Sequence, residues 1–197
     1  MQLTCCAYVV CCSLHVCLYH FCMKYRFIPY IIAEKRGRRY LSMNWTHLYT
    51  NESIYKEPIT LKAKVITGFQ RGSKELGIPT ANLNMEELGN IGNELNTGIY
   101  FGWAKLKDNI YKTVVSVGWN PFYENKHKTI EAHLLHELDD FYDENLSVLL
   151  CGYLRDETNF TGVDELISCI KSDIERAETK LTENETIAIY GIDKDKW

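Results

Sequence analysis

Apolar and polar residues alternate strictly from residue 59 to residue 65, and this pattern sets the class of fold that the chain can adopt. Odd positions carry Ile, Leu, Ala and Val, whereas even positions carry Thr and Lys. Because successive side chains of a strand point to opposite faces, the alternation predicts a half-buried β-strand. Residues 99–106, 110–117, 130–136 and 146–154 have similar β character. Short strands separated by turn residues favour an antiparallel barrel or sandwich.

One stretch has helical periodicity. Between residues 163 and 181 apolar residues recur every three or four positions, and charged residues occupy the other face. Thr161 lies just before this stretch as a candidate N-cap, and Asp164 follows three residues later in the manner of a capping box. The sequence therefore predicts an amphipathic α-helix after the last predicted strand.

Length and charge divide the chain into regions. Its 197 residues are enough for one domain with an ordinary hydrophobic core. The formal net charge of −4 gives no reason to expect a nucleic-acid partner. Residues 1–58 hold seven Lys/Arg and three Asp/Glu, a net +4, which leaves −8 for residues 59–197. We predict an N-terminal extension outside the fold (1–58), a folded unit (59–183) and a C-terminal tail (184–197).

The extension begins with an uncharged, cysteine-rich stretch at residues 3–21, followed by basic residues. A membrane span needs roughly 20 apolar residues, and His15 and His20 make this stretch a poor one. Its basic residues follow the apolar run, whereas those of a secretory signal precede it. Three alternatives stay open: a poorly structured extension, a membrane or acylated anchor confined to residues 1–33, and an organelle-targeting leader. We expect the folded unit to be cytoplasmic unless the extension directs it to an organelle or membrane.

A glycine-punctuated segment at residues 68–82 suggests a phosphate-binding loop. Gly68, Gly72 and Gly77 allow the backbone to approach a ligand closely, so that N–H groups can point at anionic oxygens. Lys74 would add a positive charge beside them. The alternative is a surface hairpin with ordinary turn glycines. Neither a Walker A motif nor a Gly-x-Gly-x-x-Gly motif occurs, so a parallel-sheet nucleotide fold is not expected.

Thr80 and Asn82 follow Pro79 at the end of this segment. In an extended backbone their side chains lie on the same face, where both oxygens can meet one cation. Neutral oxygen ligands suit Mg²⁺, which takes its remaining ligands from water and substrate phosphates. A Thr that is merely buried in a hairpin is the alternative interpretation.

Glu131 is the candidate for acid–base chemistry. On a strand it projects opposite the apolar row formed by Ile130, Ala132 and Leu134. If that face lines a cavity, the carboxylate can serve as a general base, and if it faces water, it is a solvated charge. Alternation alone leaves both interpretations open.

Seven sequence blocks, taken in order, resemble the riboflavin kinase family: residues 72–83, 97–102, 115–121, 130–133, 140–142, 152–155 and 159–160. The order and spacing hold from about residue 59 to residue 181, and the chain is most similar to the monofunctional eukaryotic form. The resemblance implies a mainly β fold, a six-stranded antiparallel Greek-key β-barrel with a C-terminal α-helix. It also implies a phosphotransferase that moves the γ-phosphoryl group of ATP to the ribityl 5′-hydroxyl of riboflavin and releases FMN and ADP.

On the nucleotide side, the resemblance implies that Thr80 and Asn82 bind a metal, Mg²⁺ or Zn²⁺, together with the phosphates. Gly68 and Lys74 would belong to the loop over the phosphates. Glu131 would be the catalytic base that accepts the proton of the 5′-hydroxyl.

Further residues follow from the same resemblance. His136 and Tyr142 would lie near the nucleotide, and Arg155, Thr158 and Phe160 would contact riboflavin or its product.

One departure from the family pattern concerns the turn after the Asp-Phe-Tyr block, where the family often has glycine and this chain has Asp143. The link between His136 and Asp140 is also one residue shorter than in the family.

Two other functions remain: a carrier or sensor that binds flavin without converting it and docks through the extension, and another small-molecule kinase on the same barrel. We expect a monomer.

Overall fold

The computed structural model describes residues 31–35, 38–68, 77–119 and 128–182. The strands are β1 (Ile31–Lys35), β2 (Arg38–Ser42), β3 (Ser53–Ile66), β4 (Ala81–Leu83), β5 (Gly98–Leu106), β6 (Asn109–Trp119), β7 (Lys128–Leu134) and β8 (Asn145–Arg155). The helices are the 3₁₀-helix η1 (Thr46–Leu48), α1 (Met85–Glu94) and α2 (Val163–Lys180). Within these described ranges, no helix is long and apolar enough to cross a membrane.

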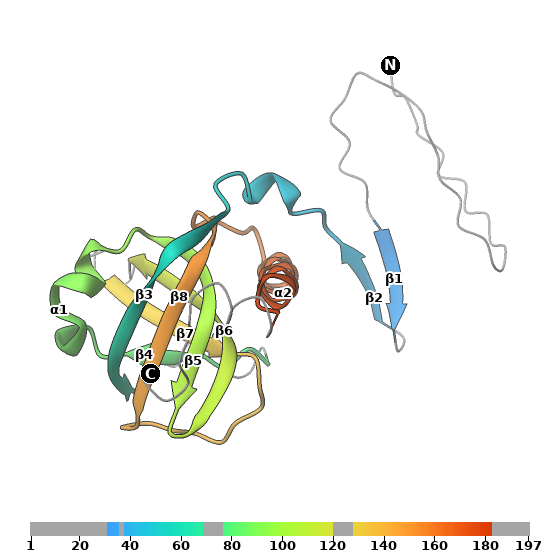
Figure 1. The fold of residues 1–197 in the computed structure, drawn as a ribbon. Coiled ribbons are helices and arrows are strands. Elements are labelled where there is room, and N and C mark those ends of the chain that lie inside the picture. The colour runs from blue at the N-terminus through green and yellow to red at the C-terminus, as the bar shows by residue number, and fades with distance from the viewer. Residues whose placement is uncertain (1–30, 36–37, 69–76, 120–127, 183–197) are drawn as a thin grey trace, which may run out of the picture.

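Six antiparallel strands close into a barrel in the order β3-β4-β7-β6-β5-β8, whereas β1 and β2 form a separate two-stranded sheet. Strands β5, β6 and β7 are successive neighbours, and β8 returns to lie beside β5, which is a Greek-key arrangement. Figure 1 shows α1 and α2 on opposite sides of this barrel. The predicted mainly β, six-stranded barrel with a C-terminal helix is confirmed.

The predicted alternation in the first barrel strand is confirmed. In β3, Leu61, Ala63 and Val65 are buried, and the residues between them are exposed. Strands β5 and β8 instead have long runs of buried residues on both faces. The barrel interior covers one face of these strands, and α2 packs over part of the other.

Five elements were not predicted: β1, β2, η1, β4 and α1. Strand β4 has only three residues, too few to show a period. Helix α1 is interrupted by Gly89, whose φ of 54° and ψ of −129° are not helical. Asn84 caps this helix, because its side chain accepts a hydrogen bond from the backbone N–H of Glu86 at 3.0 Å.

The folded unit begins earlier than the predicted boundary at residue 58. Strand β3 starts at Ser53, which pairs with Tyr153 of β8. Before that strand, Tyr49 is 7% exposed, packs in the core beneath α2, and donates a hydrogen bond to Asp173 Oδ1 at 2.9 Å. The segment from η1 onward therefore belongs to the fold, which corrects the predicted extension. The predicted tail (184–197) and residues 1–30 lie outside the described residues.

Helix α2 begins at Val163, with Gly162 at the N-cap and no side-chain cap there. The predicted cap at Thr161 is therefore wrong by one residue. Thr161 instead donates its backbone N–H and its hydroxyl to the Glu165 carboxylate, at 2.7 and 2.8 Å. These two hydrogen bonds lower the pKa of Glu165, because they stabilise its charged form.

A buried ion pair joins the end of β8 to α2. Arg155 donates from Nε to Asp173 Oδ1 at 2.8 Å and from Nη2 to Oδ2 at 2.7 Å. The side chains of Arg155 and Asp173 are only 3% and 2% exposed. A planar guanidinium matches a carboxylate in this two-point geometry, so the pair fixes both the position and the orientation of the helix.

We predict that Asp173→Ala lowers the free energy of unfolding by about 3–5 kcal/mol, because it leaves the Arg155 guanidinium buried without its partner. Urea unfolding followed by circular dichroism measures the change. The control is Glu144→Gln, which removes one charge from the exposed Lys107–Glu144 pair, whose atoms are 2.8 Å apart. That variant should keep its unfolding midpoint. Equal shifts in the two variants would contradict the prediction.

Candidate active site

The site residues meet where β4 lies between β3 and β7. Asn82 of β4 is paired with Ile66 on one side and with Glu131 on the other. Residues directly opposite each other on paired antiparallel strands extend their side chains to the same face. The β4–β7 pairing thus brings together the carboxamide and the carboxylate that the sequence singled out.

Thr80 joins this pair from just before β4. Its Oγ1 donates a hydrogen bond to Glu131 Oε2 at 3.0 Å. Because the hydroxyl proton points at the carboxylate, the lone pairs of this oxygen can face a cation. Thr80, Asn82 and Glu131 are all half-buried. Glu131 is therefore not simply a solvated charge on the outer surface of the barrel.

Gly68 lies against the side chain of Asn82. A Cβ atom at residue 68 would lie 2.6 Å from Asn82 Cγ, closer than real Cβ contacts. Only glycine lets the backbone pass so near to the carboxamide without moving it. The structure thus brings Gly68 to the same place as Thr80, Asn82 and Glu131, while Lys74 lies outside the described residues.

His136 and Tyr142 lie apart from these residues, in the connection between β7 and β8. The His136 ring stacks on Tyr111 with a centroid distance of 5.2 Å and an interplanar angle of 28°. Tyr142 is 47% exposed. Both side chains are thus accessible from solvent rather than packed in the barrel.

The departure from the family pattern in this turn has a backbone explanation. Asp143 has a φ of +65°, the left-handed region that glycine adopts readily and Asp tolerates better than most residues. Its N–H donates to Val65 O at 2.8 Å, and the N–H of Val65 donates to Glu144 O at 2.9 Å. The turn is therefore attached to β3 one residue before Ile66, the neighbour of Asn82.

The predicted flavin-side residues lie at the end of β8 and in the loop after it. Arg155 uses Nε and Nη2 for Asp173, and its Nη1 donates to the backbone carbonyl of Asp156 at 3.0 Å. Phe160 packs edge-to-face on Trp45 with a centroid distance of 6.0 Å. Arg155 therefore braces the loop after β8 from inside the protein. Flavin contacts of Arg155, Thr158 and Phe160 stay a prediction.

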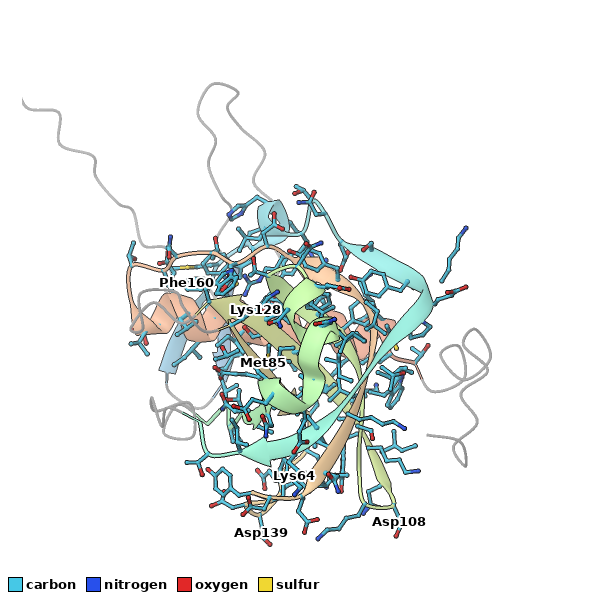
Figure 2. The ribbon with its side chains drawn as sticks, turned by 90° about the vertical axis from the view of Figure 1, so that its left-hand side faces the viewer. Lys64, Met85, Asp108, Lys128, Asp139 and Phe160 are labelled. Atoms are coloured by element: carbon cyan, nitrogen blue, oxygen red, sulfur yellow. The ribbon has the colours of Figure 1, made fainter. Side chains whose placement is uncertain are left out.

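Lys128 supports the start of β7 in a way that the sequence did not reveal. It is 8% exposed, and its Nζ donates to Asn93 O at 3.0 Å and also to Leu95 O. In Figure 2, Lys128 lies beside α1, the helix that carries Met85. Burial lowers the pKa of Lys128, while the carbonyls at the helix C-terminus stabilise its charge. Only knowledge of α1 would have identified this role.

The cysteines of the barrel and helix are not part of the site. Cys151 and Cys169 are both buried thiols that are not joined in a disulfide. Burial raises the pKa of each to about 12, so both stay protonated near neutral pH. Neither can act as a thiolate nucleophile or thiolate ligand without being exposed first.

The donor set of the site suits a hard cation better than a soft one. In the described part of the chain, no group of three or more His, Cys, Asp and Glu side chains could hold a metal ion. A cation here would depend on the oxygens of Thr80 and Asn82 and on oxygens supplied by a ligand. This is the pattern of Mg²⁺, whereas zinc sites generally use several His or Cys ligands.

Comparison with known proteins identifies the family. The family model described as "Flavokinase: Riboflavin kinase" matches residues 55–181. The riboflavin kinase of Homo sapiens is 47% identical over 126 residues, which cover 63% of this chain and 81% of that protein. The chain therefore belongs to the riboflavin kinase family.

Solved structures agree with the fold. The riboflavin kinase from Trypanosoma brucei has a TM-score of 0.53 at 24% identity, covering 66% of this chain and 83% of that one. A structure described as a macrolide-efflux protein from Streptococcus pneumoniae has a TM-score of 0.54 at 27% identity, covering 61% and 38%. The likeness to the Trypanosoma brucei structure supports the fold alone. The likeness to the Streptococcus pneumoniae structure covers only part of a longer chain.

Proposed function

We propose that Glu131, Thr80 and Asn82 form the centre at which this chain phosphorylates riboflavin. As a member of the riboflavin kinase family, the chain uses ATP to convert riboflavin into FMN, and ADP is the second product. The observation that carries the proposal is the contact between Thr80 and Glu131, 3.0 Å from Oγ1 to Oε2, with Asn82 paired opposite Glu131. The proposed metal ligands and the proposed carboxylate base thus share one face of the sheet.

Phosphoryl transfer requires that the acceptor hydroxyl be aligned and that the charge on the phosphates be neutralised. Glu131 is the general base and takes the proton of the ribityl 5′-hydroxyl. The oxygen of that hydroxyl forms a bond to the γ-phosphorus, and the bond from this phosphorus to the β–γ bridging oxygen breaks. ADP leaves with the electron pair of that bond. General-base assistance of this kind contributes roughly 10²–10⁴-fold to the rate.

Thr80 and Asn82 would hold the divalent ion, and we propose Mg²⁺ because the two side chains offer neutral oxygens. Bound Mg²⁺ would neutralise charge on the β- and γ-phosphates. Gly68 leaves room for the phosphates beside Asn82, because a side chain there would displace the carboxamide. Lys74 is proposed to add a positive charge from the same loop.

The remaining proposed contacts extend the site on both sides. His136 and Tyr142 are assigned to the nucleotide side, and Arg155, Thr158 and Phe160 to the flavin side. We also propose that the protein is a cytoplasmic monomer and that any membrane contact is made through residues 1–33.

Product analysis tests the function directly. We expect the 197-residue chain, incubated with riboflavin, ATP and Mg²⁺, to form FMN, which chromatography with flavin fluorescence detects. A parallel reaction with Zn²⁺ shows which ion supports turnover. Riboflavin that is bound but not converted under either condition would favour a flavin carrier or sensor instead.

For Glu131→Gln we expect kcat to fall by about 10²–10⁴-fold, because the amide cannot accept the 5′-hydroxyl proton. Binding of Mg-ATP, measured by calorimetric titration of the same variant, should change much less. Turnover equal to that of the unsubstituted protein would exclude the role of general base.

For Thr80→Ala we expect metal-supported nucleotide binding to be lost while the fold is retained, because the substitution removes one of two proposed oxygen ligands. Titration with ATP in the presence and absence of Mg²⁺ measures the effect, and circular dichroism monitors the fold. Thr80→Ser is the matched control: it keeps the hydroxyl and should keep most of the binding. Normal Mg-ATP binding by the alanine variant would contradict the metal assignment.

A further inference from the structure

His133 lies two residues beyond Glu131 on β7, so the two side chains point to the same face of the strand. Both are half-buried, between fully buried neighbours. Nothing in the reaction described above uses His133. Its position beside the proposed base nevertheless places it within reach of the segment that carries Thr80.

The His133 ring contacts the residue immediately before Thr80. Its Nδ1 lies 2.7 Å from the backbone carbonyl oxygen of Pro79. A carbonyl oxygen only accepts hydrogen bonds, so Nδ1 must carry the proton and donate it. Two neighbouring side chains of β7 therefore bond to two consecutive residues: His133 to Pro79 and Glu131 to Thr80.

The bond from His133 extends the contact between the two strands to Pro79, beyond their backbone pairing. Backbone pairing of β4 with β7 is observed at Ala81 and Asn82. Pro79 has no N–H and cannot donate to a continued ladder. Only its carbonyl oxygen is available for pairing, and His133 bonds to that oxygen.

This bond acts on Thr80 through the peptide plane. The carbonyl of Pro79, the nitrogen of Thr80 and the Thr80 Cα lie in one rigid plane because the peptide bond has double-bond character. Holding the carbonyl oxygen therefore restrains the peptide plane that carries the Thr80 Cα, from which the Thr80 side chain leaves the backbone. The bond from Thr80 to Glu131 then fixes the hydroxyl itself.

We propose that His133 is a positioning residue that sets Thr80 in place to receive the metal–nucleotide complex. The inference rests on the proposed function, since it gives Thr80 its role as a metal ligand. His133 touches neither substrate in this account, so its effect is on geometry. A misplacement of about 1 Å in a positioned group can cost about 10²-fold in rate.

Three substitutions at one position separate positioning from packing. His133→Asn places an amide N–H near the position of Nδ1, His133→Gln places one near Nε2, and His133→Ala places none. With alanine and with glutamine we expect the kcat/KM for Mg-ATP to fall at least tenfold. Asparagine should restore at least a third of the original value. Riboflavin affinity should stay within about twofold in all three variants.

A readout independent of turnover is the backbone amide spectrum of the 197-residue chain, recorded by ¹H–¹⁵N NMR without ligands. The Thr80 and Ala81 resonances should move in the alanine and glutamine variants and return toward their original positions with asparagine. Thermal unfolding of each variant checks that the fold is retained.

The two readouts distinguish the outcomes. If the Thr80 resonances shift in the alanine variant and return with asparagine, the positioning contact is supported. If the unsubstituted protein at the same time forms no FMN, the proposed function is overturned. Unshifted resonances with normal kinetics in the alanine variant would overturn the role of His133 and leave the function intact. Equal behaviour of the asparagine and glutamine variants would also overturn the inference, because the donor position would then be irrelevant.

Discussion

The short strand β4 pairs with β3 on one side and with β7 on the other, and this pairing closes the barrel. The same pairing places Asn82 opposite Glu131 and brings Thr80 within 3.0 Å of that carboxylate. The strand pairing that closes the barrel therefore also brings the residues of the proposed site together. Backbone hydrogen bonds supply most of the precision, because strand register leaves little freedom in where opposing side chains lie.

A second constraint acts on the loop after β8, which is assigned to the flavin side of the proposed site. The buried Arg155–Asp173 pair fixes α2 against the barrel, and the same guanidinium bonds to the carbonyl of Asp156 at the start of the following loop. Tyr49 completes the arrangement by donating to Asp173. Removing Asp173 leaves the Arg155 guanidinium buried without its carboxylate, so this pair links α2 to the start of the loop assigned to flavin.

Local patterns predicted the longer elements: β3 and α2, in which one face is buried and the other is exposed, and also β5 and β8, which are buried on both faces. The alternation at residues 59–65 gave β3 correctly, and the helical period gave α2. Strand β4 was too short to show a period, and Gly89 interrupted α1. The boundary at residue 58 was placed too late because Tyr49 is held by Asp173, 124 positions away in the sequence.

By itself the sequence determined which functional groups are present: a hydroxyl, a carboxamide and a carboxylate. It also determined that the chain resembles one kinase family and forms short strands around a barrel. The tertiary structure decided which of these groups meet. Thr80 and Glu131 are 51 positions apart, and the contact between Pro79 and His133 spans a similar separation. Periodicity reports only which side of a strand a residue faces, whereas pairing register and chain closure set which residues lie opposite one another.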